Sequence, residues 1–183
     1  MAAGQTPGVR RLAESLDVGC GRAKAEGYLG MDGIPFPGVD VVWNLEDVPW
    51  PFEADRFDRI RVIHVVEHIE NQTGFFKELH RVARNGAIIH VETPHFSSRD
   101  SWSDPTHVRH FSAFFAEPMT GDGYLTAVTG RFEVVSRRVN FGSFFRSWRA
   151  RLVVALLGYE AWERNAFRMP GLNVHLDLRV VKP

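Results

Sequence analysis

The chain has 183 residues, of which 44% are hydrophobic, and 22 basic side chains balance 22 acidic ones. This length is enough for one domain with a substantial core. The balanced charge leaves no basic field to attract polyanions, which argues against a nucleic-acid partner. The first residues lack the charged and apolar stretches of a signal peptide, and the longest apolar run, 152–157, is too short to cross a bilayer. A single cysteine, Cys20, excludes an internal disulfide. We therefore expect a cytoplasmic protein without a transmembrane segment.

Apolar runs bounded by turn residues predict seven strands. They lie at residues 11–16, 27–31, 39–43, 57–63, 87–92, 132–139 and 174–181. The first five are nearly continuous in apolar character, as in a parallel sheet that helices cover on both faces. The sequence thus predicts an α/β fold.

Three segments have helical periodicity. The clearest is 73–83, where apolar residues recur at steps of three and four, with Thr73 as the expected N-cap and Gly86 as a C-terminal signal. Residues 147–157 form a second amphipathic candidate, and 112–124 a less regular third. No internal repeat appears, so we expect one domain.

The most informative motif is an acidic, glycine-rich turn after the first strand. It contains Asp17, Gly19 and Gly21, and the second strand ends on Asp32. Glycines let the backbone turn tightly and approach a ligand, and an acid that ends the next strand can bind both hydroxyls of a ribose. The motif indicates a cofactor that contains a nucleoside.

Two details distinguish this motif from a dinucleotide site. The third glycine of the G-x-G-x-x-G pattern is missing, because Lys24 occupies its position. The carboxylate of Asp17 would repel a pyrophosphate, but it suits a ligand with an ammonium or sulfonium charge. S-adenosylmethionine fits these residues better than NAD.

The segment Asp17-Val-Gly-Cys-Gly21 resembles the first motif of class I S-adenosylmethionine-dependent methyltransferases. The run at 44–52, the pair Phe57-Asp58, the segment 64–68 and the helix with its turn at 75–86 are similar, in this order, to the methyltransferase type 11 group. The resemblance covers roughly residues 11–95. It implies a Rossmann-like, seven-stranded, mostly parallel sheet whose last strand is antiparallel. Only residues 22–27 separate the glycine turn from the second strand, so the first helix of the family should be shortened.

The resemblance also implies the cofactor site. Asp17 would accept hydrogen bonds from the methionine amino group, Asp32 would bind the ribose, and Asn44 would face the adenine amine with Leu45 beside the ring. His64, at the carboxyl end of the fourth strand, should lie near the transferable methyl group. The expected cofactor-binding residues are Asp17, Gly19, Cys20, Gly21, Asp32, Asn44, Leu45 and His64.

A second group of polar residues follows the fifth strand, where this fold commonly builds its acceptor site. A histidine with a pKa near neutrality can accept the proton of a hydroxyl or amine, so His107, His95 and His110 are the catalytic candidates. Arg109 and Asp104 are the expected substrate-binding residues. A purely structural loop and a metal site are alternatives, and the spacing fits no zinc pattern well.

Two other functions remain open at this point. His64-x-x-Glu67-His68 spells a zinc-hydrolase motif, with Glu67 as general base, although such a motif belongs inside a long helix. A non-catalytic cofactor-binding module is the other alternative. Residues 131–151 carry six arginines and one acid, a pattern that suits an anionic partner such as RNA or a membrane surface, a cap over the site or a dimer contact.

We therefore predict a cytoplasmic methyltransferase that acts on O or N of a small molecule, such as a sugar or secondary metabolite. A homodimer is an open alternative to a monomer. The expected single domain covers 1–183. It has a flexible lead at 1–10, an acceptor-site segment at 96–125 and a helical insertion at 142–171.

Overall fold

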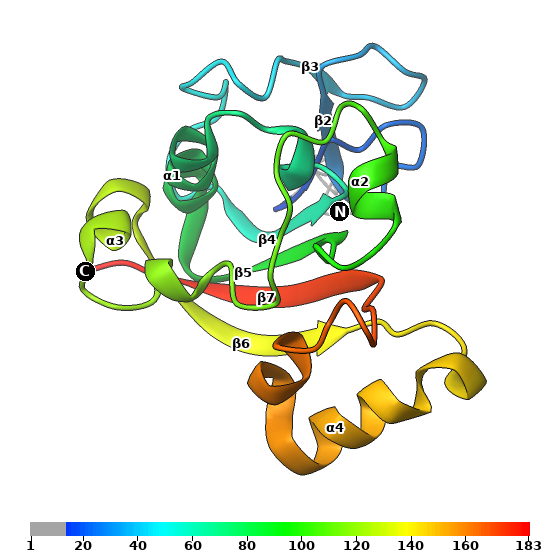
Figure 1. The fold of residues 1–183 in the computed structure, drawn as a ribbon. Helices are drawn as coiled ribbons and strands as arrows, with labels where there is room; N and C mark the ends of the chain where they lie inside the picture. The colour runs from blue at the N-terminus through cyan, green and yellow to red at the C-terminus, as the bar shows by residue number, and fades with distance from the viewer. Residues whose placement is uncertain (1–13) are drawn as a thin grey trace, which may run out of the picture.

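A computed structural model describes residues 14–183, leaving aside the side chains of residues 144–146. One seven-stranded sheet runs through the molecule in the order β3-β2-β1-β4-β5-β7-β6 (Figure 1). β1 to β5 are parallel, and β7 runs antiparallel to both of its neighbours. The predicted mixed sheet with an antiparallel last strand is confirmed. The strands are β1 (Ser15–Val18), β2 (Leu29–Asp32), β3 (Val41–Val42), β4 (Phe57–Ile63), β5 (Ala83–Pro94), β6 (Arg131–Val139) and β7 (Asn173–Val181).

The helices are few and mostly short. They are the 3-10 turn η1 (Val66–His68), α1 (Gln72–Val82), α2 (Asp100–Ser103), the 3-10 turn η2 (Glu117–Met119), α3 (Tyr124–Thr129) and α4 (Phe144–Glu163). Only turns lie between β1 and β2, so the first helix, which was expected to be shortened, is reduced to turns. The expected flexible lead falls outside the described residues.

Several predicted boundaries need correction. The side chain of Asn71, not of Thr73, caps α1 by accepting a hydrogen bond from Gly74 N. Gly86 does not end the helix, because β5 begins directly after Val82 and Gly86 lies inside that strand with φ +81°. The third predicted helix, 112–124, is wrong: this region contains only η2, and α3 begins at Tyr124. In α4, Gly158 breaks the helix with φ 82°.

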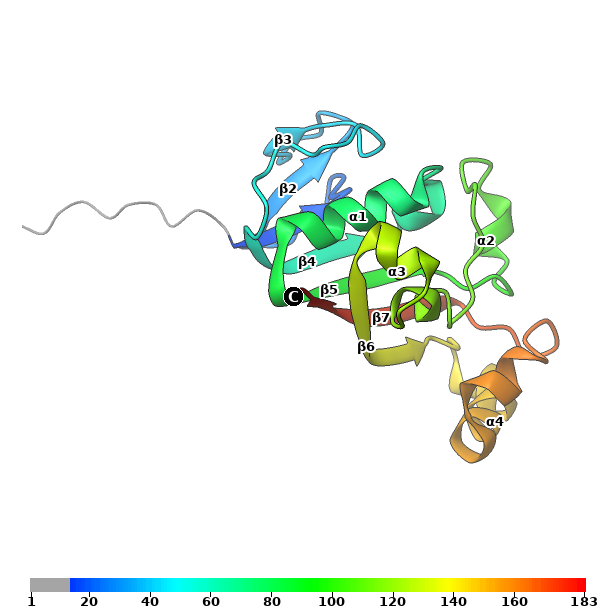
Figure 2. The same cartoon turned by 90° about the vertical axis from the view of Figure 1, so that its left-hand side faces the viewer.

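The two faces of the sheet differ. α1 and α3 pack on one face, where side chains such as Ile60, Ile89 and Leu176 are fully buried (Figures 1 and 2). The alternate side chains of β5 and β7 are mostly polar and half-buried, including His90 and Asp177. The expected second layer of helices is not seen over these strands within residues 14–183. Alternation of apolar and polar residues is the pattern of a sheet with one open face.

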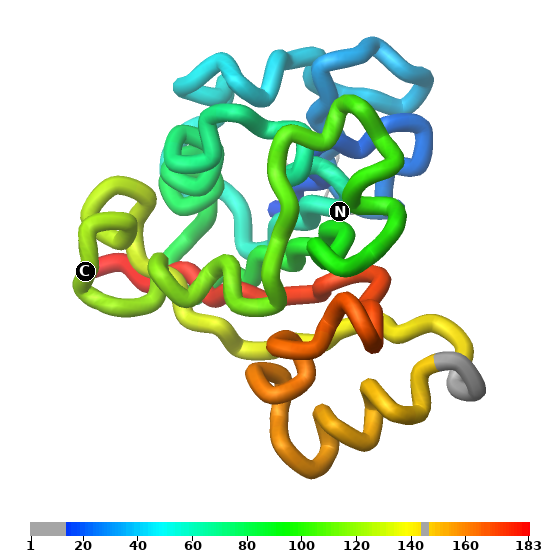
Figure 3. Tube along the Cα trace, in the orientation of Figure 1, coloured from blue at the N-terminus to red at the C-terminus, as the bar shows by residue number. Residues whose placement is uncertain are grey.

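The chain crosses the carboxyl ends of the parallel strands in one segment. Residues 95–111, which include α2, leave β5 and pass over the ends of β4 and β5 (Figure 3). His95 and Phe111 form a bridge that closes this segment into a loop. The glycine turn after β1 lies at the same edge of the sheet. The topology therefore brings the two predicted halves of the site to one edge.

An ion pair between the buried Glu78 and the half-buried Arg81 anchors the loop between β3 and β4. The Glu78 carboxylate accepts hydrogen bonds from Trp50 N at 2.7 Å and from Arg81 Nε at 2.8 Å. Burial of Glu78 disfavours its charged form, but the hydrogen bonds from Arg81 and Trp50 outweigh this and lower its pKa. The indole of Trp50 is 2% exposed. Glu78 thus ties α1 to the loop that begins at Asn44.

We predict that Glu78→Gln lowers the free energy of unfolding at pH 7 by about 2 kcal/mol, because it removes a charged acceptor from one buried donor, Trp50 N, and one half-buried donor, Arg81. Because the folded-state pKa is lowered, the stabilisation exists above the pKa of the unfolded chain and is lost as the pH falls through the folded-state value. Denaturant unfolding at pH 7 and in mild acid measures both effects, with the exposed Glu53→Gln as control. Equal stability of the two variants at pH 7 would contradict the anchor.

Candidate functional site

The glycine turn is held against two strands. Gly19 N and Cys20 N both donate to Met31 O, at 2.7 and 3.2 Å, which ties the turn to the end of β2. Gly19 has φ +65°, and a Cβ there would lie 2.3 Å from Val65 Cγ2. Only glycine fits this position, because the segment after β4 packs directly on the turn. The turn therefore contacts the start of the His64–Glu67 segment.

Cys20 is buried inside this turn. Burial, followed by the nearby charge of Asp17, raises the pKa of its thiol. A Cβ on Gly30 would lie 2.7 Å from the Cys20 sulfur, so the side chain fills the space against β2. A buried thiol with a raised pKa is a packing residue and not a nucleophile.

Asp17 is 1% exposed and holds the turn through one oxygen. Its Oδ2 accepts hydrogen bonds from Ala25 N at 2.8 Å and from Arg61 at 3.0 Å. No residue in the described part of the chain donates a hydrogen bond to Oδ1. A carboxylate oxygen has two acceptor positions, so Asp17 keeps capacity for a cationic or N–H ligand. Arg61 was missed from the sequence, because its partner lies on a neighbouring strand.

Asp32 holds the other side of the same turn. Its Oδ2 accepts a hydrogen bond from Gly21 N at 2.8 Å, and its Oδ1 accepts one from Ile34 N at 2.9 Å. An ionised carboxylate has about four acceptor positions, so both oxygens retain one for a ligand hydroxyl. The two predicted acids thus bind opposite sides of one loop.

Asn44 and Leu45 begin the loop that Glu78 anchors. Asn44 is exposed, and its Oδ1 accepts a hydrogen bond from Glu46 N at 3.2 Å. Leu45 packs on the core, and its carbonyl accepts from the Trp50 indole at 3.2 Å. Both residues follow β3, next to the strand that ends at Asp32. Their predicted contacts with adenine stay predictions.

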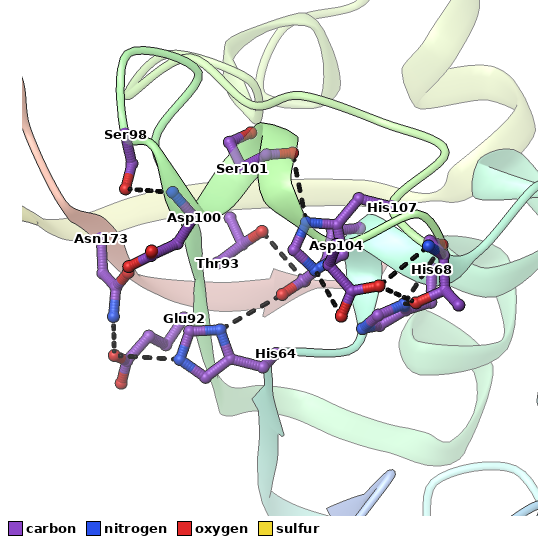
Figure 4. Close-up of polar contacts among 12 residues, drawn as sticks. His64, His68, Glu92, Thr93, Ser98, Asp100, Ser101, Asp104, His107 and Asn173 are labelled. Atoms are coloured by element: carbon purple, nitrogen blue, oxygen red, sulfur yellow. Dashed lines mark hydrogen bonds and ion pairs between the residues drawn. The ribbon is translucent and has the colours of Figure 1, made fainter.

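His64 is the first residue beyond β4 and has φ +53°. Its Nδ1 lies 3.2 Å from Oε1 of Glu67, whose Oε2 accepts a hydrogen bond from Thr93 at 3.0 Å (Figure 4). The hydrogen bond to Glu67 raises the pKa of His64, partly opposed by burial. Glu67 itself is 1% exposed. The buried carboxylate therefore fixes the orientation of an exposed imidazole.

The H-x-x-E-H motif does not lie in a long helix. His64 follows a strand, and Glu67 and His68 belong to the single 3-10 turn η1. The scaffold that a zinc hydrolase of this type requires is therefore missing from the described chain.

The loop that carries the predicted acceptor residues is pinned to η1. Val108 N and Arg109 N both donate to Glu67 O, at 2.8 and 3.2 Å. The His107 ring meets the His68 ring edge to face, with centroids 4.8 Å apart, and its Nε2 lies 3.9 Å from Asp104 Oδ2. Hydrogen bonds from Thr106 lower the pKa of Asp104. His68, which the sequence analysis named only as part of the H-x-x-E-H motif, thus lies beside His107 and Asp104 (Figure 4).

The other predicted side chains of this loop lie elsewhere. His95 is fully buried, with Nδ1 2.7 Å from Ser97 Oγ and Nε2 2.9 Å from Glu163 Oε1. Both ring nitrogens are occupied, so in this arrangement His95 joins the loop to α4 and has no free position for an acceptor.

His110 and Arg109 lie at the exposed side of the loop. The His110 ring stacks on Trp102 at 3.7 Å, and its Nδ1 is 2.9 Å from Ser101 Oγ. The Arg109 guanidinium donates to the carbonyls of Glu70 and Val108. Of the three candidate histidines, His107 is thus the one that the structure brings beside η1.

A family model described as a methyltransferase domain matches residues 6–119, more than half of the chain. The chain belongs to this family. It is a class I S-adenosylmethionine-dependent methyltransferase, as the sequence predicted, and the likeness to the type 11 group remains a resemblance. No curated protein matches the sequence. None of the helices within residues 14–183 is both long and apolar enough to span a bilayer.

Solved structures share the fold at low identity. An S-adenosylmethionine-dependent methyltransferase from Archaeoglobus fulgidus is 18% identical with a TM-score of 0.57, and the match covers 90% of this chain and 85% of that one. Geranyl diphosphate C-methyltransferase from Streptomyces coelicolor, solved with Mg²⁺ and S-adenosyl-L-homocysteine, is 13% identical with a TM-score of 0.58. That match covers 91% of this chain and 70% of the other. The [4+2]-cyclase SpnF is 16% identical with a TM-score of 0.58, and the match covers 92% of this chain and 75% of that one. The fold thus also carries reactions other than transfer to O or N.

The residues at the glycine turn fit S-adenosylmethionine. Asp17 has an oxygen without a protein donor in the described chain, and Asp32 has acceptor capacity at both oxygens. A carboxylate pair suits an ammonium at one end of the ligand and a ribose diol at the other.

We predict that Asp32→Asn weakens S-adenosylmethionine binding at least about tenfold, because one amide group cannot accept from Gly21 N, Ile34 N and a ribose together. Isothermal calorimetry with S-adenosylmethionine and S-adenosylhomocysteine measures this. Asp122→Asn, a change on an exposed turn before α3, should bind as the wild type does. Unchanged affinity in a folded Asp32→Asn protein would contradict the assignment.

Proposed function

We propose that this methyltransferase acts on an oxygen or nitrogen of a small polar molecule, such as a sugar or a secondary metabolite. The observation that carries the proposal is the pinning of the 104–109 loop to the main chain of Glu67. Glu67 lies two residues from Val65, which packs on Gly19 of the cofactor turn. A continuous set of contacts therefore connects the predicted cofactor site to His107 and Asp104.

The proposed role of this loop is to align the acceptor. S-adenosylmethionine supplies, when bound, a methyl group on a sulfonium, and displacement at that carbon needs the attacking atom in line with the leaving sulfur. His107 and Asp104 offer an imidazole and a carboxylate that hydrogen-bond a hydroxyl or amine. Alignment by such contacts contributes much of the acceleration in a displacement that needs little acid or base chemistry from the protein.

Charge distribution favours a small acceptor over RNA. Three arginines of β6 that made residues 131–151 basic are close to acids: Arg131 to Asp122, Arg137 to Glu117 and Arg138 to Asp177. Paired arginines offer a weaker field to a phosphate backbone than free ones. Homodimer formation and a cytoplasmic location stay predictions.

A screen with labelled S-adenosylmethionine tests the proposal. We expect label in a small-molecule fraction of a metabolite extract that contains sugars, phenols and amines, and none in RNA. His107→Ala should lower kcat about 100-fold, because a small misplacement of the acceptor reduces the rate of displacement by about that factor. The affinity for S-adenosylmethionine should stay within about twofold of the wild type.

His90→Ala, on the open sheet face, is the matched control and should keep wild-type kcat. Label in RNA would overturn the choice of acceptor. Tight cofactor binding with no transfer to any fraction would favour the non-catalytic module.

A further inference from the structure

We infer that Glu67, His68 and His107 form a binding site for a divalent transition metal such as zinc, next to the proposed acceptor loop. Each residue offers a ligand atom, and these atoms all lie within 4.8 Å of one another. Glu67 and His68 come from η1, and His107 comes from the loop after α2. The set is a His₂-carboxylate group, which leaves positions open for water or a ligand.

The hydrogen bonds around both histidines prepare them as ligands. His68 Nδ1 lies 3.2 Å from Thr106 O, and His107 Nδ1 lies 3.2 Å from Ser101 O. A carbonyl oxygen only accepts, so each Nδ1 carries the proton and each Nε2 keeps its lone pair. Metal-binding histidines typically donate their other N–H in this way, which fixes the tautomer and the ring orientation.

The carboxylate of Glu67 is also held in place. Its two oxygens contact His64 Nδ1 and Thr93 Oγ1, and its side chain is buried. A carboxylate oxygen with one hydrogen bond can still coordinate a cation. Asp104 Oδ2, at 3.9 Å from His107 Nε2, is in reach as a further oxygen ligand (Figure 4). A bound metal ion would balance the negative charges of Glu67 and Asp104, which lie close together.

The distances allow a site without backbone movement. Zinc–ligand bonds of about 2.1 Å place tetrahedral ligands about 3.4 Å apart. The ligand atoms now lie within 4.8 Å of one another, and rotation of side chains can bring them to the shorter spacing, since His68 and Asp104 are at least partly exposed. The two backbone bonds from Val108 N and Arg109 N to Glu67 O keep both segments together. The Arg109 guanidinium is bonded to the carbonyls of Glu70 and Val108.

This set differs from the H-x-x-E-H hypothesis. His64 is not part of it, and His107, far along the chain, takes that place. The link to methylation rests on the proposed function: an open metal position would hold the oxygen or nitrogen of the acceptor. Metal binding itself is measured without any acceptor.

The test uses the full chain without an affinity tag, stripped of metal with a chelator. Titration with Zn²⁺ in a calorimeter and with Co²⁺ in a spectrophotometer should show one equivalent bound and visible Co²⁺ absorption bands. His68→Gln, His107→Gln and Glu67→Gln should each weaken binding at least tenfold and reduce those bands. Ser101 contacts His107 only through its main-chain carbonyl, and its hydroxyl bonds His110, which is outside the proposed site, so Ser101→Ala should bind Zn²⁺ as the wild type does.

A second cluster provides the control. His90, Glu92 and His175 on the open sheet face also lie within 4.8 Å of one another. His90→Gln and His175→Gln should leave the affinity for Zn²⁺ unchanged. Loss of binding in these variants but not in His68→Gln or His107→Gln would overturn the site, as would absence of stoichiometric binding to the wild type.

Thermal unfolding of each variant shows whether it is folded, and S-adenosylhomocysteine affinity separates this test from the proposed function. A folded variant that binds the cofactor but not the metal supports the site. A wild type that binds metal at this site but transfers no methyl group would overturn the function and not the site.

Discussion

The site depends on two carboxylates that hold one loop from opposite sides. Asp17 at the end of β1 binds Ala25 N, and Asp32 at the end of β2 binds Gly21 N. No helix separates these strands in the described structure, so the short loop is held by these two bonds together with the bonds of Gly19 N and Cys20 N to Met31 O. The same two acids are the predicted cofactor ligands, so the prediction assigns the loop and the cofactor to the same side chains.

A second constraint connects this loop to the segment that carries the predicted acceptor residues. Gly19 must lack a side chain because Val65 packs on it. Glu67, two residues after Val65, fixes the loop that carries His107 through its main-chain carbonyl. The buried carboxylate of Glu67 orients His64 and lies beside His68. One short segment after β4 therefore positions groups that the chain brings from β1, β5 and the loop beyond α2.

The sequence predicted the parts that depend on local pattern. β4 has the predicted bounds, because an apolar run with clear turn residues on both sides leaves little choice. The spacing of Asp17 and Asp32 singled out the two acids that bond the same loop, and their roles toward the cofactor stay predictions. The helix end at Gly86 was predicted wrongly. A glycine with positive φ can end a helix, but it can also occur inside a strand, as Gly86 does in β5. The burial of His95 depends on its contact with Glu163, and the position of His68 depends on its contact with His107 in the 104–109 loop. Both contacts join distant segments of the chain, which sequence periodicity does not reveal.

The most direct test of the account is a crystal structure with S-adenosylhomocysteine bound. The account predicts that both ribose hydroxyls lie within hydrogen-bond distance of the Asp32 carboxylate, with the amino group at Asp17 Oδ1 directly or through one water. The sulfur should face His64 and the 104–109 loop. A ligand bound elsewhere, or one whose ribose does not touch Asp32, would contradict it.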